Sequence, residues 1–113
     1  MKTKSLRIIE GLVSVMSSDA ETSWSQWMDF ERKNVEDIPE LSGVYMMHAA
    51  MKILYIGSGE NLRQKLLESL SEPCISKAKR FRYMATQLPD EVKEQLLNEY
   101  LRKHGKLPEC IEK

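Results

Sequence analysis

Two tyrosines, each close to a glycine, are the residues of this sequence whose type and spacing best suit chemistry. Tyr45 ends a Gly-Val-Tyr triplet at residues 43–45, and Tyr55 begins a Tyr-Ile-Gly triplet at residues 55–57. A tyrosine hydroxyl can donate and accept hydrogen bonds, whereas the ring packs well in a strand. Each tyrosine alone is therefore explained as readily by packing as by function, and only the pair predicts a site.

A β-hairpin followed by a helix is predicted to position this pair. Residues 44–47 and 52–56 have strand character and are joined by a short loop. Side chains alternate along a strand, so Tyr45 and Met47 are expected on one side of the hairpin. A flexible Gly-Ser-Gly break then lets a helix begin near Glu60. The apolar face of that helix consists of Leu62, Leu66, Leu67 and Leu70.

The segment before the hairpin is expected to be helical. Apolar residues recur at helical spacing within residues 4–16, and serines just after them offer caps for a second helix over residues 19–33. Trp24 and Trp27 fall on one face of the second helix, where they are expected to pack on the sheet. We therefore predict an N-terminal helical extension over residues 1–37.

One domain is expected to follow, over residues 38–113. Residues 77–86 have the character of a third strand with its lead-in. Pro89, followed by two acidic residues, is a typical helix start, and Gly105 is a typical helix end. The predicted order of elements is thus two helices, a hairpin, a helix, a strand and a helix.

Taken together, these features resemble the GIY-YIG nuclease family, which is found in homing endonucleases and in the N-terminal domain of a bacterial excision-repair nuclease. The triplet at residues 43–45 is a common variant of the family's first motif, and residues 55–57 match the second. The resemblance covers residues 38–108. It implies an α/β sandwich with a three-stranded antiparallel sheet flanked by helices. It also implies endonuclease activity on DNA with one divalent metal, usually Mg²⁺.

The resemblance assigns the two family tyrosines to Tyr45 and Tyr55 and the family arginine to Lys65. A lysine keeps the charge but lacks the planar fork that grips phosphate at two points. Arg63 lies two residues away, which is about 200° of rotation on a helix, so it cannot take the same place. For Lys65, a retained phosphate contact and an ordinary solvated lysine both stay open.

The family glutamate on the last helix corresponds to Asn98, although counting back from Pro108 would favour Glu99. An asparagine carbonyl is neutral and holds Mg²⁺ poorly compared with a carboxylate. Glu99 and Glu94 could substitute, although both are equally explained as solvated helix residues. The asparagine that often follows in the family falls near Ile111 and is missing.

A basic stretch with interleaved aromatic residues is a candidate nucleic-acid surface. No acidic residue occurs between Pro73 and Pro89. The alternative is a solvated strand face whose aromatic side chains lie in the core. With Arg63 added, the candidate contacts are Arg63, Lys77, Lys79, Arg80 and Arg82.

The composition limits the alternatives. The formal net charge is zero, so no whole-chain field attracts nucleic acid, although residues 19–40 are acidic and residues 41–113 carry twelve bases against nine acids. Cys74 and Cys110 lack zinc-site spacing and are expected to be free thiols in a reducing cytosol. The N-terminal apolar run is too short and too charged to span a membrane, which predicts a cytoplasmic protein.

Three functions are consistent with these residues. The leading hypothesis is a GIY-YIG-like domain that binds nucleic acid or a protein partner and has a degenerate, weak or inactive phosphodiesterase site. The first alternative is an active Mg²⁺-dependent DNA endonuclease with a shuffled site. The second is a structural or protein-interaction module that never meets nucleic acid.

Overall fold

A four-stranded antiparallel sheet organises the chain, and the computed structural model describes residues 24–111 of it. The strands are β1 (Met28–Asp29), β2 (Gly43–Ala49), β3 (Lys52–Gly59) and β4 (Arg80–Ala85), arranged in the order β1-β4-β2-β3. The predicted hairpin and third strand are therefore confirmed as β2, β3 and β4. The two-residue strand β1 extends the predicted three-stranded sheet by a fourth strand.

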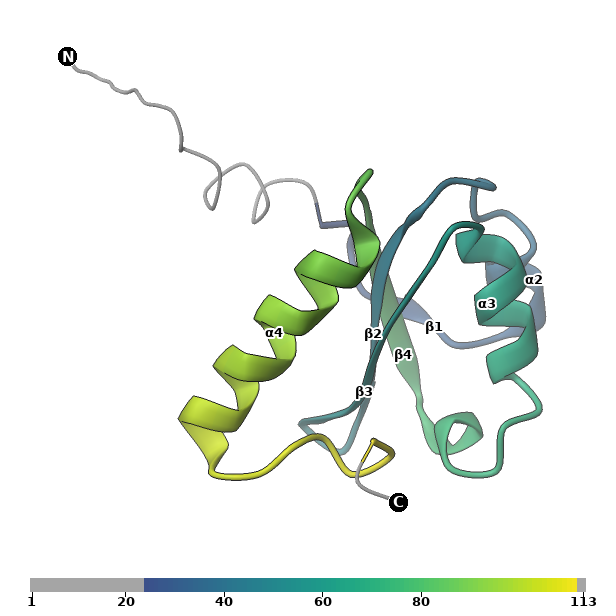
Figure 1. Ribbon diagram of the computed structural model, residues 1–113. Coiled ribbons are helices and arrows are strands. Elements are labelled where there is room, and N and C mark those ends of the chain that lie inside the picture. Colours follow the sequence, from purple (N-terminus) through teal and green to yellow (C-terminus); the bar gives the residue numbers. More distant parts are fainter. Residues whose placement is uncertain (1–23, 112–113) are drawn as a thin grey trace, which may run out of the picture.

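Helices cover both faces of this sheet (Figure 1). The short helix α2 (Arg32–Val35) and α3 (Leu62–Ser69) lie on one face, and α4 (Pro89–His104) lies on the other. A 3₁₀ turn, η1 (Ile75–Lys77), leads into β4. The resulting α/β arrangement is the predicted fold class.

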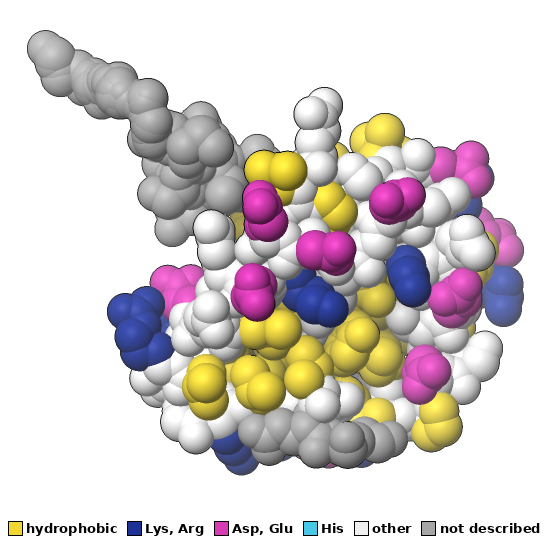
Figure 2. Space-filling model, in the orientation of Figure 1, with side chains coloured by type: hydrophobic (Ala, Val, Ile, Leu, Met, Phe, Trp, Pro, Cys, Tyr) yellow, Lys and Arg dark blue, Asp and Glu magenta, His cyan; other side chains and the backbone are white. Residues whose placement is uncertain are grey.

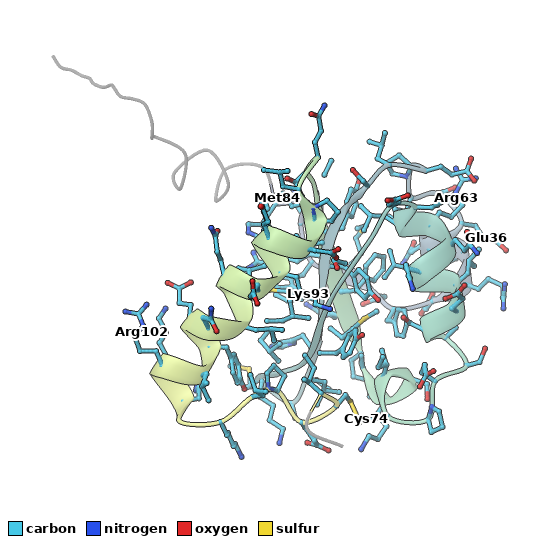
Figure 3. All side chains as sticks on the ribbon, viewed as in Figure 1. Glu36, Arg63, Cys74, Met84, Lys93 and Arg102 are labelled. Atoms are coloured by element: carbon cyan, nitrogen blue, oxygen red, sulfur yellow. A yellow bond between two sulfur atoms is a disulfide. The ribbon has the colours of Figure 1, made fainter. Side chains whose placement is uncertain are left out.

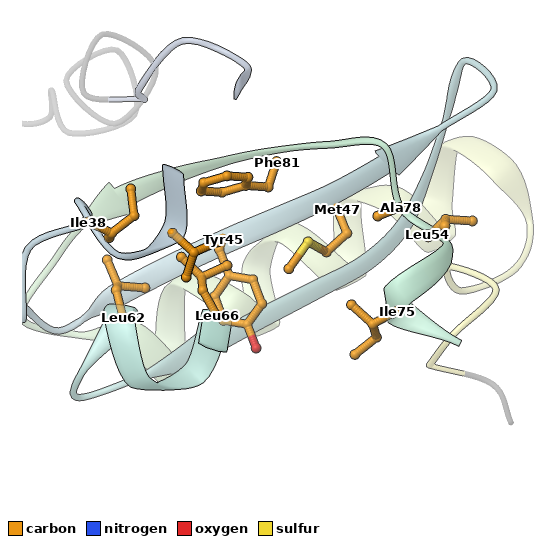
Figure 4. Packing of buried hydrophobic residues seen from close by; sticks show 10 residues of the cluster. Ile38, Tyr45, Met47, Leu54, Leu62, Leu66, Ile75, Ala78 and Phe81 are labelled. Atoms are coloured by element: carbon orange, nitrogen blue, oxygen red, sulfur yellow. The ribbon is translucent and has the colours of Figure 1, made fainter. Parts of the chain in front are cut away.

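The main core lies between the sheet and the helices α2 and α3 (Figure 4). Tyr45, Met47 and Phe81 project from β2 and β4 toward Leu62 and Leu66 of α3, and all five side chains are buried. The alternation of side chains along the strands turns a second set of buried residues toward α4. This second set includes Val44, Ile56 and Met84.

The predicted helix over residues 19–33 is wrong for the part of it that the structure describes. Met28 and Asp29 pair with Phe81 and Arg80 of β4, and helical structure is confined to Arg32–Val35. The helical spacing of the apolar residues is outweighed by tertiary contacts, because the Arg82 guanidinium packs on two indole rings. Its carbon lies 4.6 Å from the centre of the Trp24 ring and 4.7 Å from that of Trp27. The predicted helix over residues 4–16 lies outside the described residues.

The prediction of free thiols is also wrong, because Cys74 and Cys110 form a disulfide. The chain after α4 returns along β3, where the Cys110 amide donates a hydrogen bond to the Leu54 carbonyl at 2.9 Å. This return brings Cys110 beside the loop that precedes η1, although 36 residues separate the two cysteines in sequence. The spacing of two cysteines says nothing of such a contact. The cytoplasmic location stays a prediction.

The last helix has the predicted ends. Pro89 stands in its first turn with Asp90 and Glu91, where acidic side chains complement the positive end of the helix dipole. Gly105 ends it at φ 75°, a left-handed conformation that glycine adopts without steric cost. Among the described residues, no helix has the length and the apolar character needed to cross a membrane.

Candidate active site

Tyr45 and Tyr55 lie together on the sheet face that α3 covers. Tyr45 pairs with Gly57 across the β2–β3 hairpin, and Tyr55 pairs with Met47, so the two tyrosines are diagonal neighbours. Their ring centres are 6.0 Å apart and the rings are tilted by 40°. The predicted convergence of the two hydroxyls beside the following helix is thus the observed geometry.

Gly57 makes this convergence possible. A Cβ atom at position 57 would overlap the Tyr45 ring, and it would lie 2.5 Å from the Tyr45 hydroxyl oxygen and 2.7 Å from a ring carbon of Tyr55. Contacts this short require the rings to move. The glycine of the second triplet is therefore needed because two tyrosine rings close over its backbone.

Tyr45 is nearly inaccessible, with 3% of its surface exposed. Burial raises the pKa of the Tyr45 hydroxyl well above its ordinary value, and electrostatic interaction with Tyr55 raises it further. A hydrogen bond with Ser69 lowers this pKa in part. Tyr45 is therefore protonated at neutral pH and acts as a neutral hydrogen-bond partner rather than as a base.

Helix α3 supplies the polar wall of the site. Its first turn is fixed by Asn61, whose side-chain oxygen accepts a hydrogen bond from the Gln64 amide at 3.1 Å. The Ser69 hydroxyl donates to the Lys65 carbonyl at 2.9 Å. A Cβ atom at Gly59 would lie 2.6 Å from Cγ of Lys65, so the stem of Lys65 rests directly on the end of β3.

A cavity of about 320 Å³, here called the tyrosine pocket, lies between these groups. Tyr45 and Tyr55 line it from the sheet, and Lys65, Glu68 and Ser69 line it from α3. The segment after α3 and the C-terminal tail complete it with Glu72, Cys74, Ile75 and Cys110. The disulfide therefore forms part of the pocket wall, and Figure 3 shows Cys74 below the end of α3.

The charges in the tyrosine pocket favour a cation over an anion. Among the described residues that line the pocket, one lysine faces two carboxylates, those of Glu68 and Glu72. A phosphate that entered the pocket would be attracted by the ammonium group of Lys65 and repelled by both carboxylates. At about 4 Å, each such pair of unit charges interacts by roughly 1 kcal/mol in bulk water and more in a less polar setting.

The predicted residues of the last helix do not reach the tyrosine pocket. Asn98, Glu94 and Glu99 are exposed, and none of them lines the pocket. Glu99 lies 3.8 Å from the guanidinium of Arg102. The side chains of α4 that are partly buried are Pro89, Val92, Lys93, Leu96, Leu97 and Tyr100. They include a lysine (labelled in Figure 3) but no carboxylate, and the exposed Asp90 accepts a hydrogen bond from the Ser58 hydroxyl of β3 at 2.8 Å, outside the tyrosine pocket.

The metal that the resemblance implies does not fit the positions that the resemblance assigns to it. No carboxylate of α4 lines the tyrosine pocket, and the described residues contain no cluster of three or more His, Cys, Asp or Glu side chains that could hold a metal ion. Glu68 of α3 and Glu72 of the segment after it are two carboxylates that line the tyrosine pocket together with Lys65. Magnesium in proteins is commonly held by one or two carboxylates together with water and substrate phosphate, so this pair is a different candidate.

The predicted nucleic-acid contacts are mostly engaged within the molecule. Arg63 donates from Nε to the Ile38 carbonyl at 2.7 Å and lies 3.9 Å from Glu40. It therefore ties α3 to the loop between α2 and β2. Lys77 forms an ion pair with Glu109 at 3.2 Å. Arg80 forms one with Asp29 at 3.6 Å. Lys79 is exposed.

Arg82 differs from its neighbours because it is partly buried. Besides the two indoles, its Nη2 lies 3.8 Å from the sulfur of Met46. Its Nε is buried and has no hydrogen-bond partner among the described residues. Burial lowers the pKa of Arg82. The basic stretch is therefore not a continuous row of free cations.

Sequence reasoning missed Glu68, Ser69 and Glu72 as pocket residues. Glu68 stands three residues after Lys65, a spacing at which side chains share one face of a helix, whereas Glu72 follows the end of α3. This spacing was visible in the sequence. The participation of Cys74 and Cys110 depends on the return of the tail, which no local pattern indicates.

A family model described as "Domain of unknown function (DUF7508)" matches residues 23–103, and the chain belongs to that family. No curated protein matches the sequence. Among solved structures, the chain is similar to the GIY-YIG N-terminal endonuclease domain of UvrC from Thermotoga maritima, bound to its catalytic divalent cation, magnesium. The identity is 21% and the TM-score 0.53, over 70% of this chain and 92% of that one. The structure of a point mutant of the same domain is 20% identical with the same TM-score, over 70% of this chain and 91% of that one. The fold of this chain is therefore GIY-YIG-like.

Proposed function

We propose that this domain binds nucleic acid and cleaves phosphodiester bonds weakly or not at all. The observation that carries the proposal is the charge of the tyrosine pocket. The nuclease-like hairpin, the tyrosine pair and a lysine are retained, whereas no carboxylate of α4 lines the tyrosine pocket. The domain keeps the framework of the fold and lacks the arrangement of charges that phosphodiester hydrolysis needs.

Hydrolysis requires a group that prepares water and positive charge that stabilises the transition state. Tyr45 is held neutral by burial and offers a hydrogen bond, not a base. Lys65 offers one point charge to the phosphate, without the two-point grip of an arginine. Glu68 and Glu72 oppose the negative charge that gathers on the phosphate in the transition state. Losing one electrostatic contact of this kind costs about two to three powers of ten in rate.

Nicking of supercoiled plasmid tests the proposal. We expect no nicking above background with Mg²⁺ or Mn²⁺. Robust metal-dependent nicking that is abolished by Tyr55→Phe, and kept by Tyr83→Phe, would overturn it. Tyr83 is a matched control because it projects from β4 on the same sheet face and lies outside the pocket.

A second experiment addresses binding directly. Without metal, Glu68→Gln combined with Glu72→Gln should raise the affinity for labelled DNA by about fivefold, because two repulsive charges of roughly 1 kcal/mol or less each are removed. Glu94→Gln combined with Glu99→Gln makes the same change of charge on α4, outside the pocket. An equal gain from both pairs would mean that only net charge matters.

An active Mg²⁺-dependent endonuclease is the second candidate, and the position of Glu68 and Glu72 in the tyrosine pocket favours it. In that case these two carboxylates would hold the ion, and the bound ion would offset the charge on the leaving oxygen. Lys65 and the Tyr55 hydroxyl would position the phosphate. The variant Glu68→Gln with Glu72→Gln would then abolish nicking and would remove any gain in DNA affinity on addition of Mg²⁺.

The remaining alternative is a module for protein interactions that never binds nucleic acid. We propose a nucleic-acid partner instead. Separately, we propose a cytoplasmic location. Absence of binding to duplex, branched and single-stranded DNA at about 50 mM salt, where phosphate contacts are strongest, would leave the interaction module as the better explanation.

A further inference from the structure

A second concave site lies at the end of the hairpin, away from the tyrosine pocket. The C-terminal end of α4 and the β2–β3 turn lie at the same end of the molecule (Figure 1). Between them is a cavity of about 370 Å³, here called the hairpin-end groove. The residues used in the argument below are His48, Met51, Lys52, Tyr100, His104 and Lys106. An adjoining cavity of about 170 Å³ shares Lys52, Tyr100 and Lys106.

One wall of the groove is aromatic. The rings of Tyr100 and His104 stack at 4.2 Å with 34° between their planes, one helical turn apart on α4. On the opposite side, the His48 ring lies 5.0 Å from the Trp27 ring. Flat rings at the edge of an open cavity are the kind of surface on which nucleobases stack.

Met51 forms an exposed apolar lip. It is 90% exposed, so the side chain contributes almost nothing to the core. It also stands at φ 68°, after Ala50 at φ 51°, in a turn where glycine or asparagine would be the unstrained choice. A large apolar residue that is both exposed and strained does not stabilise the fold. Strain of this kind is characteristic of sites that bind something.

The charges of the groove are opposite to those of the tyrosine pocket. Of the residues that the structure describes, Lys52 and Lys106 line it, and no carboxylate does. Lys52 is paired with Glu109 at 3.1 Å on the rim, in the adjoining cavity. Lys106 is exposed. An anion is therefore favoured here, and an apolar or aromatic part of the same ligand fits the wall and the lip.

We infer that the hairpin-end groove binds one nucleotide of a single-stranded nucleic acid. The base packs between Met51 and the Tyr100 ring, and a flanking phosphate lies near Lys106, because Lys52 is paired with Glu109. A single strand fits this groove better than a duplex, because a base must leave its stack to enter the cavity and does so at little cost in a single strand. The inference does not depend on the proposed function of the tyrosine pocket, which lies on the other face of the sheet.

Fluorescence anisotropy with a labelled oligothymidylate and with a duplex of similar length tests this site in the full chain. We expect the single strand to bind more tightly than the duplex. Lys106→Glu should weaken binding about tenfold, whereas Lys103→Glu should change it less than threefold. Lys103 is the matched control, because it is an exposed lysine at the same end of α4 that lines neither cavity.

Met51→Gly separates binding from folding. It removes the apolar lip and relieves the strained φ, so we expect binding to weaken about fivefold through the loss of apolar contact with the base, while the Tm does not fall. Equal binding of all variants, tighter binding of the duplex, or equal competition by polyglutamate would overturn the inference. Tyr55→Phe should leave single-strand binding unchanged, so failure of the tyrosine pocket and failure of this groove can be told apart.

Discussion

At the scale of single residues, close contacts explain why the motif contains a glycine. The Gly57 backbone passes under the Tyr45 and Tyr55 rings, and any side chain there meets both. We predict that Gly57→Ala lowers the free energy of unfolding by about 1–3 kcal/mol, the usual cost of overpacking. Urea denaturation measures this change.

Gly59→Ala is the control for that substitution. The three atoms nearest to its added methyl group all belong to the Lys65 side chain, which is exposed and has more freedom to change rotamer than two packed aromatic rings. It should cost clearly less stability than Gly57→Ala. Equal losses from the two variants would show that the tyrosine rings yield as easily as a lysine stem, and that glycine is not required at position 57.

The buried Tyr45 hydroxyl predicts a loss of stability at alkaline pH. Burial raises its pKa in the folded state, whereas in the unfolded chain it titrates near the ordinary value of about 10. The unfolded state therefore releases its proton first, and the contribution of Tyr45 to stability is complete below about pH 10 and falls above it. Tm measured between pH 8 and 11 should drop less steeply for Tyr45→Phe than for the unmodified protein. An equal dependence of Tm on pH in the two proteins would contradict the raised pKa of Tyr45.

At the scale of elements, the disulfide is the main link between the C-terminal tail and the segment before β4. It closes a loop of 36 residues, for which the loss of chain entropy in the unfolded state corresponds to about 3–4 kcal/mol. We predict that the variant Cys74→Ser with Cys110→Ser is destabilised by about this amount in urea denaturation. Reduction of the unmodified protein should give the same loss, and stability unaffected by either treatment would contradict the prediction.

Periodic patterns in the sequence predicted those helices and strands whose formation depends on neighbouring residues. The hairpin, α3 and α4 were predictable because their alternation, caps and turn residues act within a few positions. Residues 24–31 were assigned to a helix, because periodicity cannot reveal that Arg82 would pack on Trp24 and Trp27. The tyrosine pair of the candidate site was predictable from spacing. Its carboxylates were sought on α4, where Asn98 proves to be exposed, and not on α3 and the segment after it.

At the scale of the whole molecule, the two concave sites differ in charge. Among the described residues, the tyrosine pocket is lined by more carboxylates than lysines, and the hairpin-end groove is lined by two lysines and no carboxylate. On the face that Figure 2 shows, basic and acidic side chains are interspersed and form no continuous basic patch. Positive and negative charges are thus mixed over this face, so only short stretches of a phosphate backbone can be neutralised on it at once.

This balance predicts a weak dependence of DNA binding on salt. Among the described residues, Arg80 is paired with Asp29, and Lys52 and Lys77 are both paired with Glu109. The two lysines lower the pKa of the Glu109 carboxyl through their hydrogen bonds, so it stays charged at neutral pH. Each neutralised phosphate contributes a slope of about −0.9 to the logarithmic dependence of the binding constant on salt, and we expect a total between about −2 and −3.

Releasing the paired bases should steepen that dependence. Asp29→Asn frees Arg80, and Glu109→Gln frees Lys52 and Lys77, so the slopes should change by about −1 and about −2, respectively. Glu91→Gln removes one negative charge from the first turn of α4 without breaking an ion pair among the described residues, and its slope should stay near that of the unmodified protein. The measurement is a salt titration of binding to labelled DNA. A slope of about −5 or steeper in the unmodified protein would mean that the ion pairs open on binding and that the whole basic stretch contacts the phosphates.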